Sequence, residues 1–195
     1  MANRKAEKTR VTSETTINCR LVLDGSGNAQ ISTGIGFYDH MLTALSKHAG
    51  FDVTLNCEGD LHIDDHHTVE DCALTLGACL DEALGERRGI ERFGHAYVPL
   101  DEALARAVVD FSGRPCPSIQ LNLVREKIGE MACENIEHFF ESFAIAARMS
   151  LHVDIIKGRN DHHKAEAAFK AVARALRDAV RTNESGQVPS TKGVL

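Results

Sequence analysis

The chain has 195 residues, of which 43% are hydrophobic and 26% are charged, and its formal net charge is −6. These values are typical of a soluble globular protein, and no apolar run approaches the roughly 20 residues that a membrane helix needs. The negative charge argues against a nucleic-acid-binding protein, because such proteins neutralise phosphates with basic side chains. A charged segment at Met1–Arg10 and six scattered cysteines favour a cytoplasmic protein with reduced thiols.

Two segments rich in β-branched residues open the predicted fold. They are Val11–Leu23 and Ala29–Thr33, and the glycine-containing Asp24–Asn28 between them predicts a hairpin turn. A helix is expected over Tyr38–Ala49, because its apolar residues recur at helical spacing. Gly50 is suited to the left-handed cap that ends such a helix.

The next segment combines short strands with a long amphipathic helix. Phe51–Leu55 and Asp60–Ile63 are predicted as strands. His66–Leu84 is predicted as a helix because its apolar residues form one stripe. Asp65 occupies the N-cap position, and Gly85 lies just past the end.

The second part of the chain contains the same kinds of elements. The predicted strands are Phe93–Pro99, Ala103–Phe111, Ile119–Val124 and Leu151–Ile156, and the predicted helices are Glu134–Met149 and His162–Thr182. The tail after these elements has no periodic apolar pattern.

An internal repeat relates the two parts. The pattern Asp-His-His-x-x-Glu occurs at Asp65–Glu70 and again at Asp161–Glu166. A shift of 96 residues aligns the helices that start at these motifs, and His40 aligns with His138 upstream after a two-residue adjustment. Such self-similarity indicates two copies of one structural unit.

The repeat sets the expected domain organisation. Residues 1–91 form the first half-repeat, residues 92–182 form the second, and residues 183–195 form a C-terminal tail that covers the substrate. Together they are expected to make one catalytic domain. Each unit is a small sheet with two helices packed on one face, so the predicted fold class is α+β.

The repeated histidines and glutamates are candidate metal ligands. His66 and Glu70 are four residues apart on one helix face, and His162 and Glu166 repeat that spacing. His67 follows His66, and His163 follows His162, and each points about 100° away from its predecessor around the helix axis. We expect these two histidines to serve a different ion. Isolated histidines are usually not ligands, but two motifs in register favour metal binding.

Symmetry predicts two metal sites from eight ligands. One contains His40, His66 and Glu70 completed by His163, and the other contains His138, His162 and Glu166 completed by His67. Three imidazoles and a carboxylate suit Mn, Fe, Co, Ni or Zn, whereas the lack of thiolate ligands argues against a structural zinc site. The neighbouring acids expected to orient the rings are Asp39, Asp71 and Glu137.

The chain resembles the imidazoleglycerol-phosphate dehydratase family over nearly its whole length. The segments that carry the resemblance are Arg10–Thr15, Gly36–Leu42, Asp65–Asp71, Asp110–Pro115, Gly158–Ala167 and Pro189–Leu195. Ala44 departs from the pattern, since many members have glutamine there. The resemblance implies the monofunctional form, without the phosphatase that is fused to the dehydratase in some members.

The resemblance implies a lyase of histidine biosynthesis with two Mn²⁺ ions per active site. Its substrate is D-erythro-1-(imidazol-4-yl)glycerol 3-phosphate, which loses water to give imidazole-acetol phosphate through a metal-bound imidazolate and a diazafulvene-like intermediate. Glu14 matches the substrate-contacting glutamate of the family and is the candidate acid/base. Glu70 and Glu166 are carried over as catalytic metal ligands.

The phosphate-binding and assembly expectations also come from the resemblance. The residues implied to bind the substrate and its phosphate are Glu14, Arg92, Arg114, Lys170, Ser190 and Lys192. The family match further implies a homo-oligomer of 24 subunits built from trimers, in which His67 and His163 complete sites on neighbouring subunits.

Two other classes of protein fit the ligand pattern alone. A binuclear metallohydrolase would use the same ligands to activate a bridging water, and it would not require an imidazole in its substrate. A non-enzymatic metal-binding module would explain the ligands but not Glu14 or the basic residues.

Overall fold

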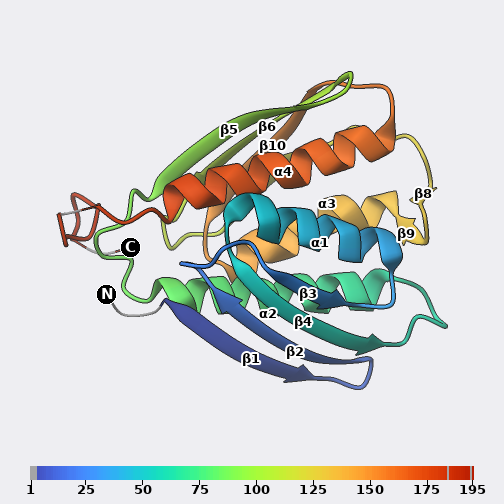
Figure 1. Cartoon of the computed structure of the whole chain (residues 1–195), viewed down its shortest axis with the longest axis horizontal. Coiled ribbons are helices and arrows are strands. Elements are labelled where there is room, and N and C mark those ends of the chain that lie inside the picture. The colour runs from blue at the N-terminus through green and yellow to red at the C-terminus, as the bar shows by residue number, and fades with distance from the viewer. Residues whose placement is uncertain (1–3, 184, 194) are drawn as a thin grey trace.

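Two four-stranded sheets enclose a layer of four helices in the computed structural model, which describes residues 4–183, 185–193 and 195 (Figure 1). The first half contains β1 (Lys5–Val11), β2 (Thr15–Val22), β3 (Ala29–Ser32), α1 (Gly36–Ala49), β4 (Asp52–Gly59) and α2 (His66–Leu84). The second half contains β5 (Phe93–Leu100), β6 (Ala103–Asp110), β7 (Cys116–Gln120), β8 (Lys127–Ile128), β9 (Met131–Ala132), α3 (Cys133–Ala146), β10 (Ser150–Lys157) and α4 (Asp161–Ala179).

The two halves have the same sheet topology. The strand order is β1-β2-β4-β3 in the first sheet and β5-β6-β10-β7 in the second. In each sheet the last pair is parallel and the other pairs are antiparallel. This agreement confirms the predicted α+β fold with an internal duplication.

A long helix covers the inner face of each sheet. α2 packs on β1 and β2, and α4 packs on β5 and β6. The two shorter helices exchange partners between the halves, because α1 packs against α4 and α3 packs against α2 (Figure 1). The helix layer is therefore built from interleaved copies of the repeat.

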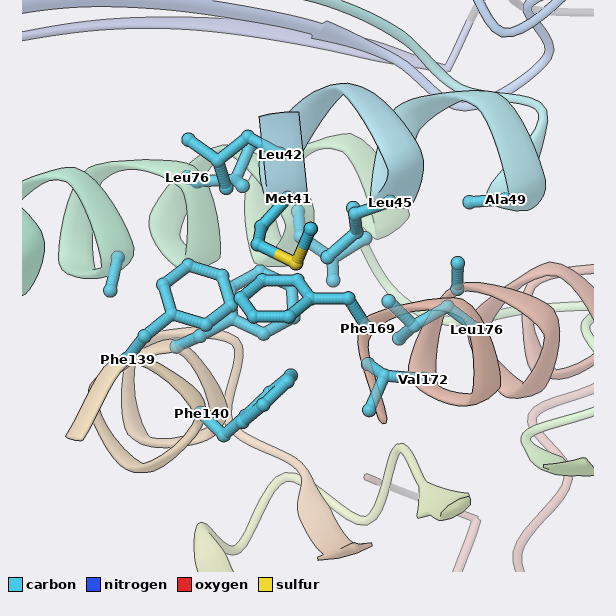
Figure 2. Packing of buried hydrophobic residues seen from close by; sticks show 14 of the residues in the cluster. Met41, Leu42, Leu45, Ala49, Leu76, Phe139, Phe140, Phe169, Val172 and Leu176 are labelled. Atoms are coloured by element: carbon cyan, nitrogen blue, oxygen red, sulfur yellow. The ribbon is translucent and has the colours of Figure 1, made fainter. Parts of the chain in front are cut away.

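Aromatic and aliphatic side chains fill the space between the helices. Met41 of α1 lies beside Phe139 of α3 and Phe169 of α4, and all three are fully buried (Figure 2). The rings of Phe139 and Phe169 stack with their centroids 5.0 Å apart. Because each shorter helix buries apolar side chains against the other half, the halves share one hydrophobic core.

The predicted helices are confirmed, with shifts at some ends. α2 has the predicted bounds, and α1 ends as predicted before Gly50, whose φ is 76°. α3 and α4 end three residues earlier than predicted, at Ala146 and Ala179. Beyond α3, Arg148 has a left-handed backbone with φ 52°, a conformation that an α-helix does not contain.

Asp65 occupies the predicted N-cap position of α2, but its side chain makes no capping hydrogen bond. Asp65 precedes the helix but already has a helical backbone conformation, whereas a capping residue needs an extended one. Asp64 Oδ1 accepts the His66 N–H at 2.9 Å instead. Asp65 Oδ2 accepts the Ala132 N–H at 2.8 Å and so ties α2 to the start of α3.

Two predicted strands also differ from the structure. Asp60–Ile63 forms a turn, in which the Ile63 N–H donates to the Asp60 carbonyl at 2.8 Å. The strand expected over Ile119–Val124 lies earlier, at Cys116–Gln120. Asn122 has a φ of 52°, and this left-handed conformation is incompatible with continuing the strand.

The predicted hairpin at Asp24–Asn28 is wrong as well. The hairpin of this sheet joins β1 to β2, whereas β3 lies at the far edge and pairs in parallel with β4. The glycine-containing segment instead wraps around Asp52, whose Oδ1 accepts the N–H groups of Ser26 and Asn28, both at 2.9 Å. These bonds to backbone N–H groups lower the pKa of Asp52 below its usual value.

Replacing Asp52 by alanine is expected to destabilise the metal-free protein by about 1.5–3 kcal/mol at pH 7, the range for losing a hydrogen bond to a charged group. Because the folded pKa is depressed, the stabilisation is present above the unfolded pKa and disappears as the pH falls through the folded pKa. Urea unfolding at pH 7 and in acid would measure this. Equal losses for Asp52→Ala and for the exposed Glu58→Ala at pH 7 would contradict it.

Among residues 4–183, 185–193 and 195, no helix is both long and apolar enough to span a membrane. All six cysteines are free thiols, as predicted, and five of them are buried.

Candidate functional site

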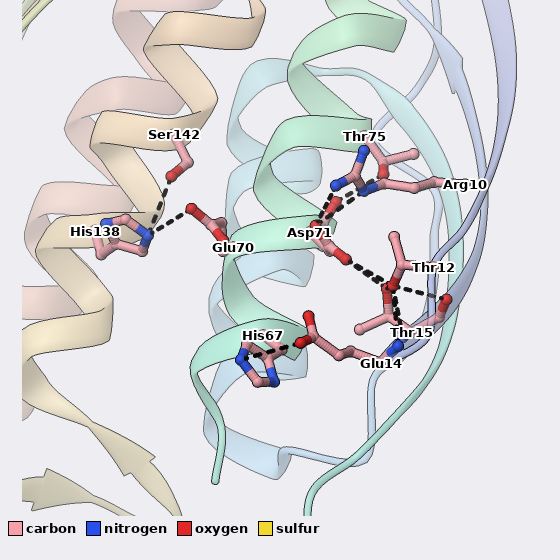
Figure 3. Close-up of polar contacts among 10 residues, drawn as sticks. All are labelled: Arg10, Thr12, Glu14, Thr15, His67, Glu70, Asp71, Thr75, His138 and Ser142. Atoms are coloured by element: carbon pink, nitrogen blue, oxygen red, sulfur yellow. Dashed lines mark hydrogen bonds and ion pairs between the residues drawn. The ribbon is translucent and has the colours of Figure 1, made fainter. Parts of the chain in front are cut away.

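The first cluster of ligand-type side chains joins α2 to α3. His66 and Glu70 lie one turn apart at the start of α2. Figure 3 shows Glu70 facing His138, whose Nε2 lies 3.2 Å from Glu70 Oε1. The rings of His66 and His138 stack with their centroids 4.8 Å apart. One ligand atom from each residue lies within 4.8 Å of the others, so the three side chains can hold one metal ion.

The second cluster joins α4 to α1 in the same way. His162 Nε2 lies 3.2 Å from Glu166 Oε2, and His40 Nε2 lies 3.4 Å from the same oxygen. These three residues also offer ligand atoms within 4.8 Å of one another. The repeat has therefore produced two equivalent groups of two imidazoles and one carboxylate.

The predicted division of ligands between the two sites remains a prediction, because within one copy of the chain the structure groups two of the histidines differently. Sequence symmetry assigned His40 to the motif of its own half, and likewise His138. The structure places His138 with the α2 motif and His40 with the α4 motif. The physical reason is the exchange of the shorter helices, since α3 packs on α2 and α1 packs on α4.

The outward-pointing histidines, His67 and His163, lie outside both clusters, in agreement with the expected rotation around the helix axis. His67 Nδ1 lies 3.0 Å from Asp60 Oδ2, and His163 Nδ1 lies 2.7 Å from Glu102 Oε2. These hydrogen bonds raise the pKa of both imidazoles. Their assignment as completing metal ligands remains a prediction.

The three acids that were expected to orient imidazoles contact other groups. Asp39 Oδ1 accepts the N–H and the hydroxyl of Thr33 at 2.9 and 2.6 Å, before α1. Glu137 Oε1 accepts the Leu121 N–H at 2.9 Å. Each of these two carboxylates binds a backbone N–H group, which lies closer to it than any imidazole nitrogen does. Both carboxylates therefore hold a backbone segment in place and do not orient a ring.

The third acid, Asp71, anchors the β1–β2 hairpin to α2. Asp71 is buried, its Oδ1 lies 2.8 Å from Arg10 Nη2, and its Oδ2 accepts the Thr15 hydroxyl at 2.6 Å (Figure 3). The anchored hairpin places Glu14 beside the start of α2. There Glu14 Oε1 lies 3.7 Å from His67 Nε2, and its side chain is 46% exposed.

Ring orientation in the clusters uses residues that sequence reasoning missed. Asn135 Oδ1 lies 2.9 Å from His66 Nδ1, one turn before His138 on the same helix. Asp60 and Glu102 fill this role for the outward-pointing histidines. Asn135 and Glu102 are distant from their imidazoles in the sequence, so no local spacing could indicate those contacts, whereas Asp60 precedes His67 by seven residues.

Lys170 lies at the second metal cluster. Its Nζ is 2.7 Å from Glu166 Oε1, one helical turn away. Burial raises the pKa of Glu166, but the charge and hydrogen bond of Lys170 and the His40 contact outweigh burial, and the net shift is downward. Glu166 is thereby kept as a carboxylate, the form that binds metal.

The residues expected at the phosphate gather at the other end of the molecule. Arg92 Nε lies 2.7 Å from Asp110 Oδ1, and Arg92 Nη1 donates to the Pro189 carbonyl at 2.8 Å. This bond ties the tail that carries Ser190 and Lys192 to the second sheet. Arg114 is exposed nearby in the chain segment that follows β6.

Within one chain, Arg92 lies far from the metal cluster on α4. The Arg92 N–H donates to the carbonyl of Ala179, the last residue of α4, whereas His162 lies at the start of that helix. Seventeen residues of helix separate them by about 25 Å. Figure 1 shows the tail beside the C-terminal end of α4, at the opposite end from its first turn.

Comparison with known proteins identifies the family. Residues 33–176 match the family model described as imidazoleglycerol-phosphate dehydratase. A protein of that name from Phytophthora nicotianae is 62% identical over 192 residues, which are 98% of this chain but 42% of that protein. The Candida glabrata protein of that name is 55% identical over 204 residues, with 95% of this chain and 97% of that protein covered.

A solved structure agrees with the fold. The crystal structure of imidazoleglycerol-phosphate dehydratase from Staphylococcus aureus is 38% identical, has a TM-score of 0.83, and covers 92% of this chain and 99% of its own. The chain therefore belongs to the imidazoleglycerol-phosphate dehydratase family.

Proposed function

We propose that this chain dehydrates imidazole-glycerol phosphate to imidazole-acetol phosphate as a cytoplasmic, Mn²⁺-dependent homo-oligomer. The observation that carries the proposal is the pair of equivalent clusters, His66–Glu70–His138 and His162–Glu166–His40. In a member of the dehydratase family, two bound metal ions would act on the imidazole ring of the substrate. The substrate supplies an imidazole ring with two nitrogen atoms.

The donor set fits Mn²⁺. Each cluster offers two nitrogen atoms and one carboxylate oxygen and leaves positions for further ligands, a pattern suited to first-row divalent metals with open sites. When bound, the metal acts as a Lewis acid and as a template for the imidazole ring. Glu70 and Glu166 are catalytic in this proposal because their carboxylates hold the metal.

Glu14 is the proposed acid/base. The carboxylate stands at the tip of the anchored hairpin, beside His67, and is exposed enough to meet a substrate. We assign Glu14 to the proton on carbon 2 of the glycerol chain, which is removed while the hydroxyl of carbon 1 takes up a proton and leaves as water. The resulting enol relaxes to the ketone, so atoms and charge balance without a redox partner.

The separation of about 25 Å along α4 supports an active site shared between copies of the chain. A substrate of six carbon atoms and one phosphate cannot span that distance. The phosphate residues of one copy would therefore meet the metal clusters of another, and His67 and His163 would complete those clusters. A closed shell of 24 subunits built from trimers meets this requirement with identical contacts throughout.

Turnover with Mn²⁺ tests the proposed reaction directly. Imidazole-glycerol phosphate should yield an enolisable ketone, detected by its absorbance in alkali, and no inorganic phosphate. Phosphate release without ketone would instead identify the binuclear metallohydrolase. Metal binding without turnover of any phosphorylated imidazole would leave only the metal-binding module.

The tail is expected to contribute to phosphate binding. Lys192 is exposed, and Ser190 Oγ accepts the Lys192 N–H at 3.2 Å in a segment tied down by Arg92. Lys192→Ala should weaken binding of phosphate-bearing inhibitors by about 1.5–3 kcal/mol, the range for a hydrogen bond to a charged group. Titration calorimetry of the Mn²⁺-loaded protein would measure this loss.

The matched control for Lys192→Ala is Lys157→Ala, which removes an exposed lysine at the end of β10. The control should bind as wild type does. Deletion of residues 190–195 should raise KM and lower kcat while metal content stays unchanged. Normal turnover of the truncated chain, or equal weakening of inhibitors with and without phosphate, would refute a role for the tail.

A further inference from the structure

Both outward-pointing histidines are held at Nδ1 by a carboxylate from outside their own helix. Asp60 Oδ2 lies 3.0 Å from His67 Nδ1, and Glu102 Oε2 lies 2.7 Å from His163 Nδ1. Asp60 follows β4, whereas Glu102 lies in the turn between β5 and β6. The same contact to the ring is thus made by two different parts of the fold.

The two carboxylates are not counterparts in the repeat. The β1–β2 and β5–β6 ladders match with an offset of 88 residues, from Lys5 to Phe93, and this offset places Glu102 opposite Glu14. β4 and β10 match with an offset of 98 residues as far as Ile155, and the register shift that follows raises the offset to 99 at Lys157, which places Asp60 opposite Arg159. Duplication of one ancestral contact therefore does not account for the bond in both halves. The bond occurs in both halves because the two imidazoles share one requirement.

That requirement is the direction of the free ring nitrogen. A carboxylate accepts hydrogen bonds, so the neutral ring carries its proton on Nδ1 and presents the Nε2 lone pair on the other side. His67 Nε2 faces Glu14 Oε1 at 3.7 Å, and His163 Nε2 faces Asp101 Oδ2 at 3.5 Å. Asp101 is 72% exposed, so His163 Nε2 is directed to the outer surface.

Glu102 is itself rigidly placed. Its Oε1 accepts the N–H groups of Arg159 and Asn160 at 3.1 and 2.8 Å, in the segment that leads into α4. The bonds from Asn160, from His163 and from Arg159 lower the pKa of Glu102 to about 2. Glu102 therefore links the start of α4 to the ring.

We propose that Asp60 and Glu102 are positioning residues, which fix the Nδ1–H tautomer of His67 and His163 so that Nε2 is presented as a metal ligand to another copy of the chain. The inference rests on the proposed metal-dependent function. The inference also assigns different roles to Glu14 and Glu102, which are counterparts in the repeat. Glu102 holds a ring, whereas Asp60 takes that task in the first half and leaves Glu14 available to the substrate.

The test is Mn²⁺ affinity, measured from the electron paramagnetic resonance signal of free Mn²⁺ during titration of metal-free protein. Glu102→Gln and Asp60→Asn should each weaken Mn²⁺ binding about 10- to 100-fold, the usual effect of removing such a partner. The melting temperature of the metal-free protein should stay close to that of wild type. Glu58→Gln, which changes an exposed carboxylate of β4, should bind Mn²⁺ as wild type does.

A double-mutant comparison separates ring positioning from a backbone effect. In a His163→Ala background, Glu102→Gln should have no further effect on Mn²⁺ affinity, because the ring that it orients is gone. An equal loss in that background, or wild-type affinity in both single variants, would overturn the inference. A wild-type chain that binds no Mn²⁺ would overturn the proposed function instead.

Discussion

Chelation of the bound metal is expected to abolish turnover and to shrink the particle, and Mn²⁺ is expected to restore both. The reason is that the two clusters hold three ligands each within the chain, so that the remaining positions are available to residues of other copies. Removing the ion would then remove a bond between subunits as well as the Lewis acid. Sedimentation velocity and the ketone assay on the same samples would measure the two effects.

His162→Ala should reproduce the effect of chelation without a chelator. The substitution removes one of the three ligands of the α4 cluster, and metal content, particle size and activity should fall together. His152→Ala is the matched control, because His152 is an exposed histidine on β10 outside both clusters. An unchanged particle size in fully metal-free protein would show that metal does not bridge the subunits.

Glu14→Gln is expected to separate chemistry from assembly. The substitution keeps the shape of the side chain but removes its basicity, so kcat should fall about 10²- to 10⁴-fold, the usual contribution of a general acid–base group. Metal content and particle size should stay at wild-type values, because Glu14 lies outside both clusters. Steady-state kinetics together with metal analysis of the same preparation would measure both.

The control for Glu14→Gln is Glu7→Gln, an exposed glutamate of β1 in the same sheet. This control should leave kcat unchanged. Near-normal turnover of Glu14→Gln would remove Glu14 from the proton transfer. A parallel loss of metal would mean that its carboxylate acts as a ligand.

The parts of the fold that the sequence predicts well are those decided by local periodicity. The apolar stripe and flanking signals of α2 define both of its ends, and Gly50 marks the end of α1. The duplicated histidine motif predicts the repeat because such a pattern is hard to obtain twice by chance. The family resemblance, carried by six motifs, is confirmed by the comparisons.

The parts that could not be predicted depend on contacts between distant segments. Turn composition at Asp24–Asn28 is compatible with a hairpin, but the carboxylate of Asp52 decides the path of the chain. Both copies of a repeat have similar apolar faces, so the sequence does not reveal that α1 packs on α4 and α3 on α2. That exchange determines which histidine joins which cluster.

The most direct test of the shared active site is complementation between two inactive variants. Glu14→Gln removes the proposed acid/base beside His67, and Arg92→Ala removes a proposed phosphate-binding residue beside the last turn of α4. The two proteins are stripped of metal, mixed in equal amounts and reassembled with Mn²⁺, with wild type treated identically as the reference. If each site takes these residues from different copies, random mixing should restore about a quarter of wild-type activity. Mixed particles that form normally but remain as inactive as either variant alone would contradict the shared site.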